Sequence, residues 1–273
     1  MSFFKSPYLQ YRFPVPKAFE NVFTHFYGAE NYAPYAITST FMPTFQTLLI
    51  FNFGNEVWMY PKSKSPIKIQ RCMVFGPVKT AFDYTLTPGA EILVISFKDD
   101  AFYRFFGNAL IGAQTPSDPD TYLDKHCFNA LWLELNALGH AASKIAYLLD
   151  FCRPYLRTQD ETATLITQFK SQKLNPIKTL AVETGKSERY IQMVHKMHFG
   201  YSAQEITRFR RFMKTIQHIR QASLAHRQID WMNLVHQCGY YDQSQLIKDF
   251  NYYIHISPKK YLKFQQDICH SAI

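Results

Sequence analysis

Apolar runs separated by turn residues dominate the first hundred or so positions of the chain. The runs at 47–53, 67–76 and 91–97 are rich in Ile, Leu, Val and Phe, a composition typical of β-strands. Turn signals separate them, among them the Thr-Pro-Gly sequence at 87–89. This spacing predicts an antiparallel sandwich or a small barrel, with a cupin-like barrel included.

Between about residue 119 and residue 171 the apolar period changes from that of strands to that of helices. Gly139 interrupts the helical pattern and Pro154 ends it. Helices of this kind either close the core of the N-terminal part or make dimer contacts, and the sequence supports both. The apolar residues that recur at helical spacing are Leu131, Leu135, Leu138, Ala142, Ile145, Leu148 and Leu149.

The last hundred residues contain a weak internal repeat of helix, glycine turn and helix. One copy is centred on Gly185 and Ser187, and the other on Gly239 and Asp242, about 55 residues further along. Each glycine can take the positive φ that ends a helix. Ser187 and Asp242 can each cap the following helix by accepting a hydrogen bond from a backbone N–H. The pattern predicts two helix-turn-helix units.

The second helix of each unit has an apolar face and a polar face. In a helix-turn-helix the second helix enters the major groove of DNA. There an amide can bond to adenine, a Lys or Arg can bond to guanine, and a Ser can bond to either. The polar faces carry Arg189, Gln192 and Lys196 in the first unit, and Gln243, Ser244, Gln245 and Lys248 in the second.

Positive charge is concentrated in the same region. Residues 172–273 contain 15 Lys and Arg against 7 Asp and Glu, a net charge of +8, while residues 1–171 carry +1. Such an asymmetry indicates a polyanionic partner, and it disfavours the alternative, a generally basic protein. The predicted phosphate contacts are Ser187, Lys196, Arg208, Arg211, Lys214 and Asp242. The two caps are included because free N–H groups beside them can face a phosphate. For the three residues of the connecting helix the alternative is a solvated helix face.

Residues 172–268 resemble the DNA-binding domain of the AraC/XylS family of transcription regulators. The resemblance is carried by LAVETGKSERYIQMVHK, by RFRRFMKTIQHI and above all by CGYYDQSQLIKDFNYYIHISPKKY. It implies two helix-turn-helix units held by a linker helix, with two recognition helices in successive major grooves. It also implies base readers, which are Arg189, Gln192 and Met193 in the first unit and Ser244, Gln245 and Lys248 in the second. Gln243, on the same polar face of the second unit, is added to the predicted base readers. Met193 stands where the family often has a polar reader, so the first unit either contacts a thymine methyl group or adds little specificity.

The N-terminal part resembles, more weakly, the compact sensor-like domain of some regulators in this family. The resemblance rests on the turn at Gly76-Pro77 and on the short helix expected at DAFYRFFG. The sequence Lys98-Asp99-Asp100 departs from the family pattern and leaves the ligand question open. We therefore expect an α+β protein with a β-rich sensor or dimerisation domain over 1–170 and a double helix-turn-helix domain over 171–273, linked by 171–176.

The resemblance implies promoter DNA as the main partner, a small-molecule effector in the N-terminal domain, a homodimer, and RNA polymerase if the protein is an activator. No stretch is long and apolar enough for a membrane span, and the N-terminus lacks a secretory pattern, so we expect a cytoplasmic protein. The five scattered cysteines predict reduced thiols. No phosphate-binding glycine loop, metalloprotease motif or nucleophile motif occurs, so we expect no enzyme, no cofactor and no metal.

Two other function classes compete with a regulator that reads a DNA sequence. One is a small-molecule-sensing protein that acts through protein partners and has only non-specific DNA affinity. The other is an alkyl-transfer DNA repair protein, since an AraC-like domain also occurs in such enzymes, but the cysteine cluster that those enzymes use for zinc is missing here.

Several aromatic and histidine positions allow two interpretations. His195 occupies an inward position where the family usually has phenylalanine, so a core position is favoured over a pH or metal role. Trp231, Tyr240 and Tyr241 could form a stacking platform for bases. Packing around the second unit is the favoured interpretation.

Overall fold

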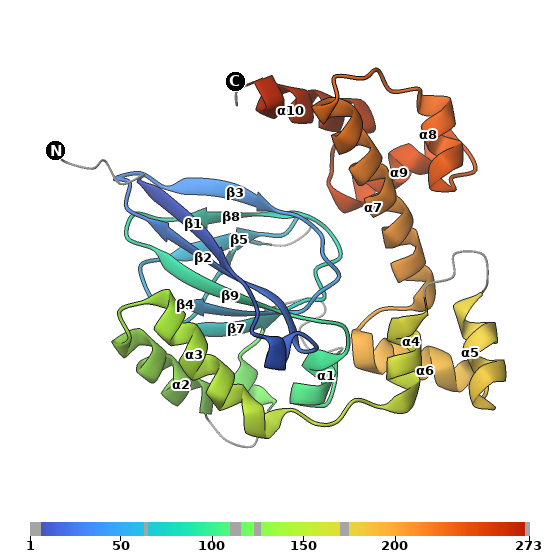
Figure 1. Ribbon diagram of the computed structural model, residues 1–273. Helices are drawn as coiled ribbons and strands as arrows, with labels where there is room; N and C mark the ends of the chain where they lie inside the picture. The colour runs from blue at the N-terminus through green and yellow to red at the C-terminus, as the bar shows by residue number, and fades with distance from the viewer. Residues whose placement is uncertain (1–6, 63–64, 110–115, 123–126, 170–174, 271–273) are drawn as a thin grey trace. The chain divides into compact units, whose positions relative to one another are not determined.

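The chain divides into two compact units, residues 1–202 and 203–273. The first unit therefore contains the β-rich part together with the first helix-turn-helix. The boundary predicted between residues 170 and 171 falls outside the described residues and stays a prediction, as does most of the predicted linker. The computed structural model (Figure 1) describes residues 7–62, 65–109, 116–122, 127–169 and 175–270.

Two antiparallel sheets face each other in the first unit, as the sequence predicts. The first sheet has the strand order β1-β2-β9-β4-β7 and the second β3-β8-β5-β6. The architecture is α+β, with this sandwich followed by helices. The strands are Tyr8–Phe13 (β1), Phe23–Asn31 (β2), Ile37–Phe41 (β3), Leu48–Asn52 (β4), Val57–Tyr60 (β5), Ile67–Lys68 (β6), Cys72–Phe75 (β7), Phe82–Leu86 (β8) and Glu91–Phe97 (β9).

Two of the strands predicted from the sequence, β4 and β9, are buried on both faces. In β4, Leu48 and Ile50 belong to the core between the sheets, while Leu49 and Phe51 point to the other face of the same sheet. A strand buried on both sides has a continuous apolar run, which explains the predictions at 47–53 and 91–97. The run at 67–76 is interrupted and forms two short strands, β6 and β7.

The other five strands were not predicted, and in four of them, β1, β2, β3 and β8, polar residues or glycine interrupt the apolar pattern. In β2, Gly28 lies under the ring of Tyr11 from the neighbouring strand β1. A Cβ at Gly28 would lie 1.9 Å from a carbon of that ring. A glycine is required here because the two strands approach closely. In the sequence alone, the same glycine interrupts the apolar pattern of a strand.

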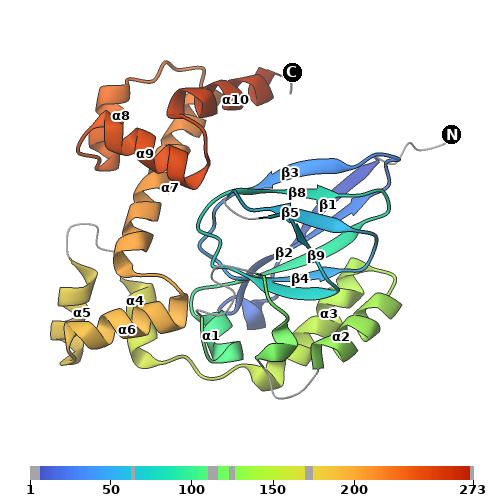
Figure 2. The same ribbon diagram turned by 180° about the vertical axis from the view of Figure 1, so that it is seen from behind.

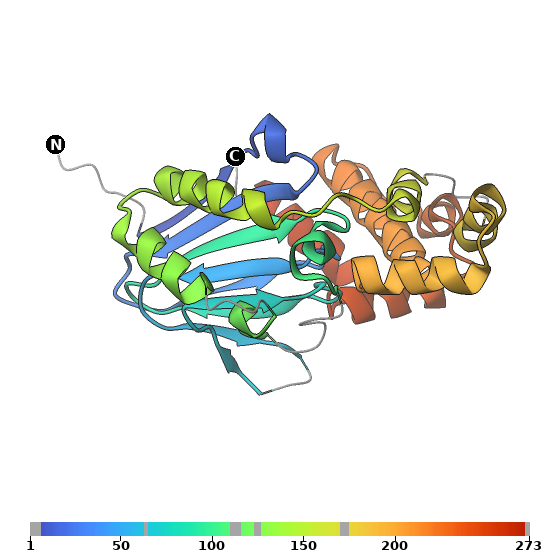
Figure 3. The ribbon, with the colours of Figure 1, turned by 90° about the horizontal axis from the view of Figure 1, so that it is seen from below.

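A second apolar layer lies between the first sheet and the helices that follow it (Figure 3). Leu131, Leu135 and Leu148 are buried in this layer, so these helices close the N-terminal core, and a dimer contact stays a prediction. The break at Gly139 and the stop near Pro154 are confirmed. The elements are the α-helices Ala101–Phe106 (α1), Cys127–Ala137 (α2), Ala141–Cys152 (α3) and Glu161–Gln168 (α4), and the 3₁₀ helices Lys17–Phe19 (η1), Pro119–Thr121 (η2) and Arg153–Tyr155 (η3).

Helices α5 (Pro176–Thr184) and α6 (Glu188–Phe199) complete the first unit, beside α4 (Figure 2). The C-terminal end of α6 is fixed to the segment that follows the β-sandwich. The ring of Tyr103 stacks on His198 with 3.7 Å between ring centroids, and the N–H of Ala109 donates to the carbonyl of Met197 at 2.9 Å. The first helix-turn-helix is therefore packed with the sandwich.

The second unit is built around the long helix α7 (Ala203–Leu224), which contacts the other three helices of the unit. Its core is aromatic, with the ring of Phe212 edge-on to Phe250 at 5.1 Å and tilted against Tyr253 at 4.6 Å. No helix among the described residues combines the length and the apolar character that crossing a bilayer requires. The remaining helices are Trp231–Cys238 (α8), Gln243–Tyr253 (α9) and Pro258–His270 (α10).

Candidate nucleic-acid interface

Local sequence signals set the ends of the two helices in the first helix-turn-helix. The side chain of Asn175 accepts hydrogen bonds from the N–H groups of Ile177 and Lys178 at 3.0 and 3.3 Å. Gly185 ends α5 with φ = 66°. Ser187 then caps α6 by accepting from the N–H of Tyr190 at 3.2 Å. The helix end at Gly185 and the cap at Ser187 are confirmed as predicted from residue type and position.

The second helix-turn-helix repeats the arrangement with different residues. Asp230 caps α8 by accepting from the N–H groups of Met232 and Asn233. Gly239 ends that helix with φ = 79°, and Asp242 caps α9 by accepting from the N–H of Gln245 at 2.8 Å. The predicted repeat is therefore confirmed as two helix-turn-helix units.

The predicted readers of the first unit share one exposed face of α6. Arg189, Gln192 and Met193 are all exposed, and Met193 is 47% exposed despite its apolar side chain. His195 lies on the opposite, buried face, and its Nδ1 is 3.1 Å from the carbonyl oxygen of Tyr201. The core position expected for His195 is confirmed.

On α9 the predicted readers divide into two groups. Gln243, Ser244 and Lys248 are exposed. Gln245 is half-buried, and its Oε1 accepts a hydrogen bond from the N–H of Tyr241 at 3.1 Å. A bidentate contact of Gln245 with adenine uses both ends of the amide, so its oxygen would have to accept a second hydrogen bond or release the first. The three exposed side chains need no such change.

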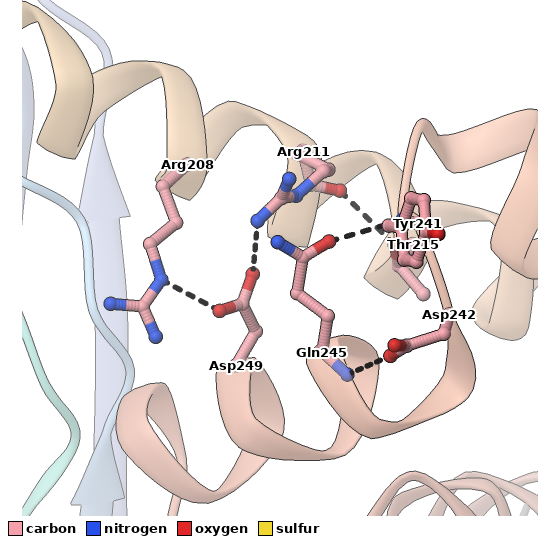
Figure 4. Close-up of polar contacts among 7 residues, drawn as sticks. All are labelled: Arg208, Arg211, Thr215, Tyr241, Asp242, Gln245 and Asp249. Carbon is pink, nitrogen blue, oxygen red and sulfur yellow. Dashed lines mark hydrogen bonds and ion pairs between the residues drawn. The ribbon is translucent and has the colours of Figure 1, made fainter.

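Two of the predicted phosphate contacts, Arg208 and Arg211, share one acidic partner inside the second unit (Figure 4). Arg208 Nε donates to Asp249 Oδ1 at 2.6 Å, and an outer nitrogen of Arg211 donates to Asp249 Oδ2 at 3.2 Å. Asp249 belongs to α9 and its side chain is only 1% exposed. A buried carboxylate is stable in its charged form only when it is paired and hydrogen-bonded, and the two guanidinium groups provide both.

Aromatic rings orient the same two arginines. The guanidinium of Arg208 lies 4.7 Å from the ring centre of Tyr252, and that of Arg211 lies 4.3 Å from the ring centre of Tyr240. In Figure 4 both terminal nitrogens of Arg208 point away from Asp249. The side chain of Arg208 is 40% exposed against 24% for Arg211. Arg208 thus keeps an exposed fork of donors, whereas Arg211 is mainly internal.

The remaining predicted phosphate contacts also differ in their surroundings. Lys214 Nζ donates to the carbonyl of Gln237 at 2.5 Å, near the C-terminal end of α8, where a cation is favourable. Asp242 is a helix cap, and a carboxylate cannot donate to a phosphate, whose charge it repels. Lys196 is exposed on α6, and the structure gives it no ion pair within the described residues.

Sequence reasoning missed Asp249 and misjudged Tyr241. An acidic residue between Leu246 and Phe250, on the inward face of α9, was the available signal for a buried ion pair. Tyr240 is buried as expected, but Tyr241 is 89% exposed, so the packing interpretation is wrong for Tyr241. The reason is its position directly before the cap of α9, in a turn that offers no core to its side chain.

No cluster of histidine, cysteine and acidic side chains suited to a metal ion occurs within the part of the chain that the structure describes. The four cysteines with described side chains, Cys72, Cys127, Cys152 and Cys238, are not joined in disulfide bonds. Burial raises the pKa of the Cys72 and Cys152 thiols, which disfavours the reactive thiolate.

Comparison with known proteins returns matches among solved structures. No model of a known protein family matches the chain, and no curated protein matches its sequence. A structure of ToxT from Vibrio cholerae is 10% identical with a TM-score of 0.42, over 95% of this chain and 99% of ToxT. ToxT from Vibrio cholerae O395 bound to (E)-4-(8-methylnaphthalen-1-yl)but-3-enoic acid gives the same identity and TM-score, over 95% and 100%.

The AraC-like transcriptional activator CuxR is also 10% identical, with a TM-score of 0.30 over 71% of this chain and 76% of CuxR. Likeness at this level does not define an activity, which has to rest on the residues of this chain. Of these similar solved structures, CuxR carries the description of an AraC-like transcriptional activator.

Proposed function

We propose that this chain is a sequence-specific DNA-binding transcription regulator of the AraC type. The observation that carries the proposal is the pair of capped helices, α6 and α9, each presenting an exposed polar face on a helix-turn-helix. In this role each helix reads one of two adjacent major grooves through its N-terminal turns. The net charge of +8 over residues 172–273 supports the proposal.

The proposed base readers follow from exposure as well as from resemblance. Arg189 and Gln192 offer hydrogen bonds from α6, and Met193 offers an apolar contact to a thymine methyl group. Gln243, Ser244 and Lys248 offer hydrogen bonds from α9, with Gln245 as a helix-capping residue that can donate through its free NH₂. Lys196 and the exposed fork of Arg208 are the proposed phosphate contacts. The regulator would act in the cytoplasm, without enzymatic activity.

Sequence-specific DNA recognition is tested by incubating the purified protein with random DNA duplexes at near-physiological salt and sequencing the duplexes that it binds. We expect an enriched motif with two clusters about one helical turn apart. Lys248→Ala should then lower the preference for that motif over random DNA by about 10- to 100-fold, or ~1–3 kcal/mol. Lys263→Ala is the matched control, since Lys263 is an exposed lysine of α10 outside the reading helices. An unchanged preference in Lys248→Ala would refute its assignment as a reader.

The same experiment addresses the competing function. A small-molecule-sensing protein with only non-specific DNA affinity would enrich no motif and would lose DNA binding steeply with salt. For the regulator, the proposal also includes an effector in the N-terminal domain, a homodimer and, if it is an activator, a contact with RNA polymerase.

A further inference from the structure

A pocket of about 700 Å³ opens at one end of the β-sandwich. Its walls are the β4–β5 turn, the residues between β6 and β7, the β8–β9 turn and the indole of Trp132 from α2. The volume falls in the range of small-molecule sites, roughly 300–1,000 Å³. All of these walls belong to the first unit, and none belongs to the helix-turn-helix units.

Hydrogen bonds between the turns hold the rim of the pocket in place. Asn55 Nδ2 donates to the carbonyl of Pro88 at 2.7 Å, and Thr87 Oγ1 donates to the carbonyl of Glu56 at 2.8 Å. Gly54 allows the turns to meet, since a Cβ there would lie 2.3 Å from the carbonyl oxygen of Gly89. A rim fixed in this way costs little ordering entropy when a ligand binds.

The indole of Trp132 forms one wall and positions a cation. Its Nε1 donates to the carbonyl of Asn52 at 2.8 Å, and its ring stacks on Phe53 at 6.4 Å between centroids. The guanidinium of Arg71 lies 4.7 Å from the centre of the indole. This cation–π contact orients the guanidinium and uses none of its N–H donors.

The charge of Arg71 is the uncompensated charge of this pocket. The other lining cation, Lys68, forms an ion pair with Glu56, and Glu56 also accepts from Trp58 Nε1 at 3.2 Å. Within the described residues, the side chain of Arg71 makes no ion pair or hydrogen bond. Phe53 and Pro88 supply apolar surface beside it.

We propose that this pocket binds a small organic carboxylate, with the Arg71 guanidinium holding the carboxylate and the apolar wall of Phe53 and Pro88 contacting the hydrocarbon part. A guanidinium fork matches a carboxylate in geometry and can bind it through two parallel hydrogen bonds. Gln70, which also lines the pocket, adds an amide donor. The proposal concerns ligand binding alone and does not depend on the proposed reading of DNA.

The probe is phenylacetate, with the uncharged phenylacetamide as its matched control, titrated into the full chain by calorimetry. We expect phenylacetate to bind and to change the emission of Trp132, and phenylacetamide to bind at least tenfold more weakly. Arg71→Ala should weaken phenylacetate binding at least tenfold. The change in tryptophan emission on binding should be largely lost in Trp132→Phe.

Arg153→Ala is the control variant, because Arg153 is another exposed arginine of the first unit that lies 5.0 Å from an aromatic ring, that of Phe19. It should bind phenylacetate like the wild type. Inorganic phosphate is the third probe. The proposal is overturned by equal binding of phenylacetate and phenylacetamide, by unchanged binding in Arg71→Ala, by failure of phenylacetate to bind at millimolar concentration, or by binding of phosphate in preference to phenylacetate.

Discussion

Burial and partners decide what an aspartate does in this chain. Asp242 is exposed and caps α9, while Asp249, seven positions further along the same helix, is buried and paired with two arginines. Asp100, directly before α1, is also buried. Its Oδ1 accepts a hydrogen bond from Gln159 Nε2 at 3.0 Å, and its Oδ2 has no hydrogen-bond partner within the described residues. Burial raises the pKa of Asp100 to about 6.

Replacing Asp100 with Asn should stabilise the protein near neutral pH. The raised pKa means that the folded state holds a proton that the unfolded state releases near pH 4. Below pH 4, near the unfolded-state pKa, the protonated Asp100 contributes its full stabilisation. That stabilisation is lost as the pH rises through about 6, the folded-state pKa. We expect Asp100→Asn to raise the free energy of unfolding at pH 7.5 by about 1–2 kcal/mol, because it carries no charge to bury.

Urea unfolding at pH 4.5 and pH 7.5 measures this effect. Asp150→Asn is the control, because the Asp150 side chain is 77% exposed and its replacement should leave the pH dependence as in the wild type. A wild-type-like difference between the two pH values in Asp100→Asn would contradict the assignment.

At the scale of elements, α9 combines a reading face and an anchoring face. The exposed face carries Gln243, Ser244 and Lys248, and the buried face carries Asp249 with Phe250. Asp249 joins α9 to α7 through Arg208 and Arg211. The orientation of the exposed side chains of α9 therefore depends on an ion pair between its buried face and α7.

Removing the charge of Asp249 should loosen this junction. We expect Asp249→Asn to lower the free energy of unfolding by about 2–3 kcal/mol, somewhat below the value for a fully buried pair because Arg208 is partly exposed. Asp242→Asn is an internal control, since Asn caps a helix about as well as Asp, and should be nearly neutral. Thermal or urea unfolding of both variants measures the difference.

The ion pair can be separated from other effects by a double-mutant cycle. With Arg208 and Arg211 both replaced by Met, the cost of Asp249→Asn should fall, since the charge of Asp249 then has no partner to lose. If the cost were the same in both backgrounds, the two arginines would not be what holds Asp249.

At the scale of the whole molecule, contacts distant in sequence fix the first helix-turn-helix to the sandwich. Gly200, directly after α6, has φ = 75°, and a Cβ there would lie 2.7 Å from the carbonyl oxygen of Ala109 and 2.9 Å from the ring of Pro77. Gly185, in the turn between α5 and α6, has a similar φ of 66° but open space around it. The two glycines differ only in what surrounds them.

This difference gives a matched pair of substitutions. Gly185→Ala should cost about 1–2 kcal/mol, the strain of a left-handed residue with a side chain. Gly200→Ala should cost clearly more, because a backbone oxygen and a proline ring resist the added Cβ. Thermal unfolding of the two variants tests the packing of α6. Equal losses would mean that residues 77 and 109 do not confine Gly200 in solution.

The sequence by itself determined the features whose partners lie within about one helical turn. Asn175, Ser187 and Asp242 cap helices, and Gly185 and Gly239 end them, because a cap or a left-handed turn is decided by the residue and its neighbours. The two helix-turn-helix units, their exposed polar faces and the strands buried on both faces follow from the same local patterns.

Only the tertiary structure decided which side chains have a partner elsewhere in the chain. Asp249 pairs with arginines 41 and 38 positions away, and α6 is fixed by residues 103 and 109. Arg71 meets Trp132 only through the fold. An apolar period states that a face is buried, but it does not state against what. Electrostatic pairing and close packing act through space rather than along the chain. Which cations are paired, which are free and in what order the strands lie are therefore decided only when distant segments come together.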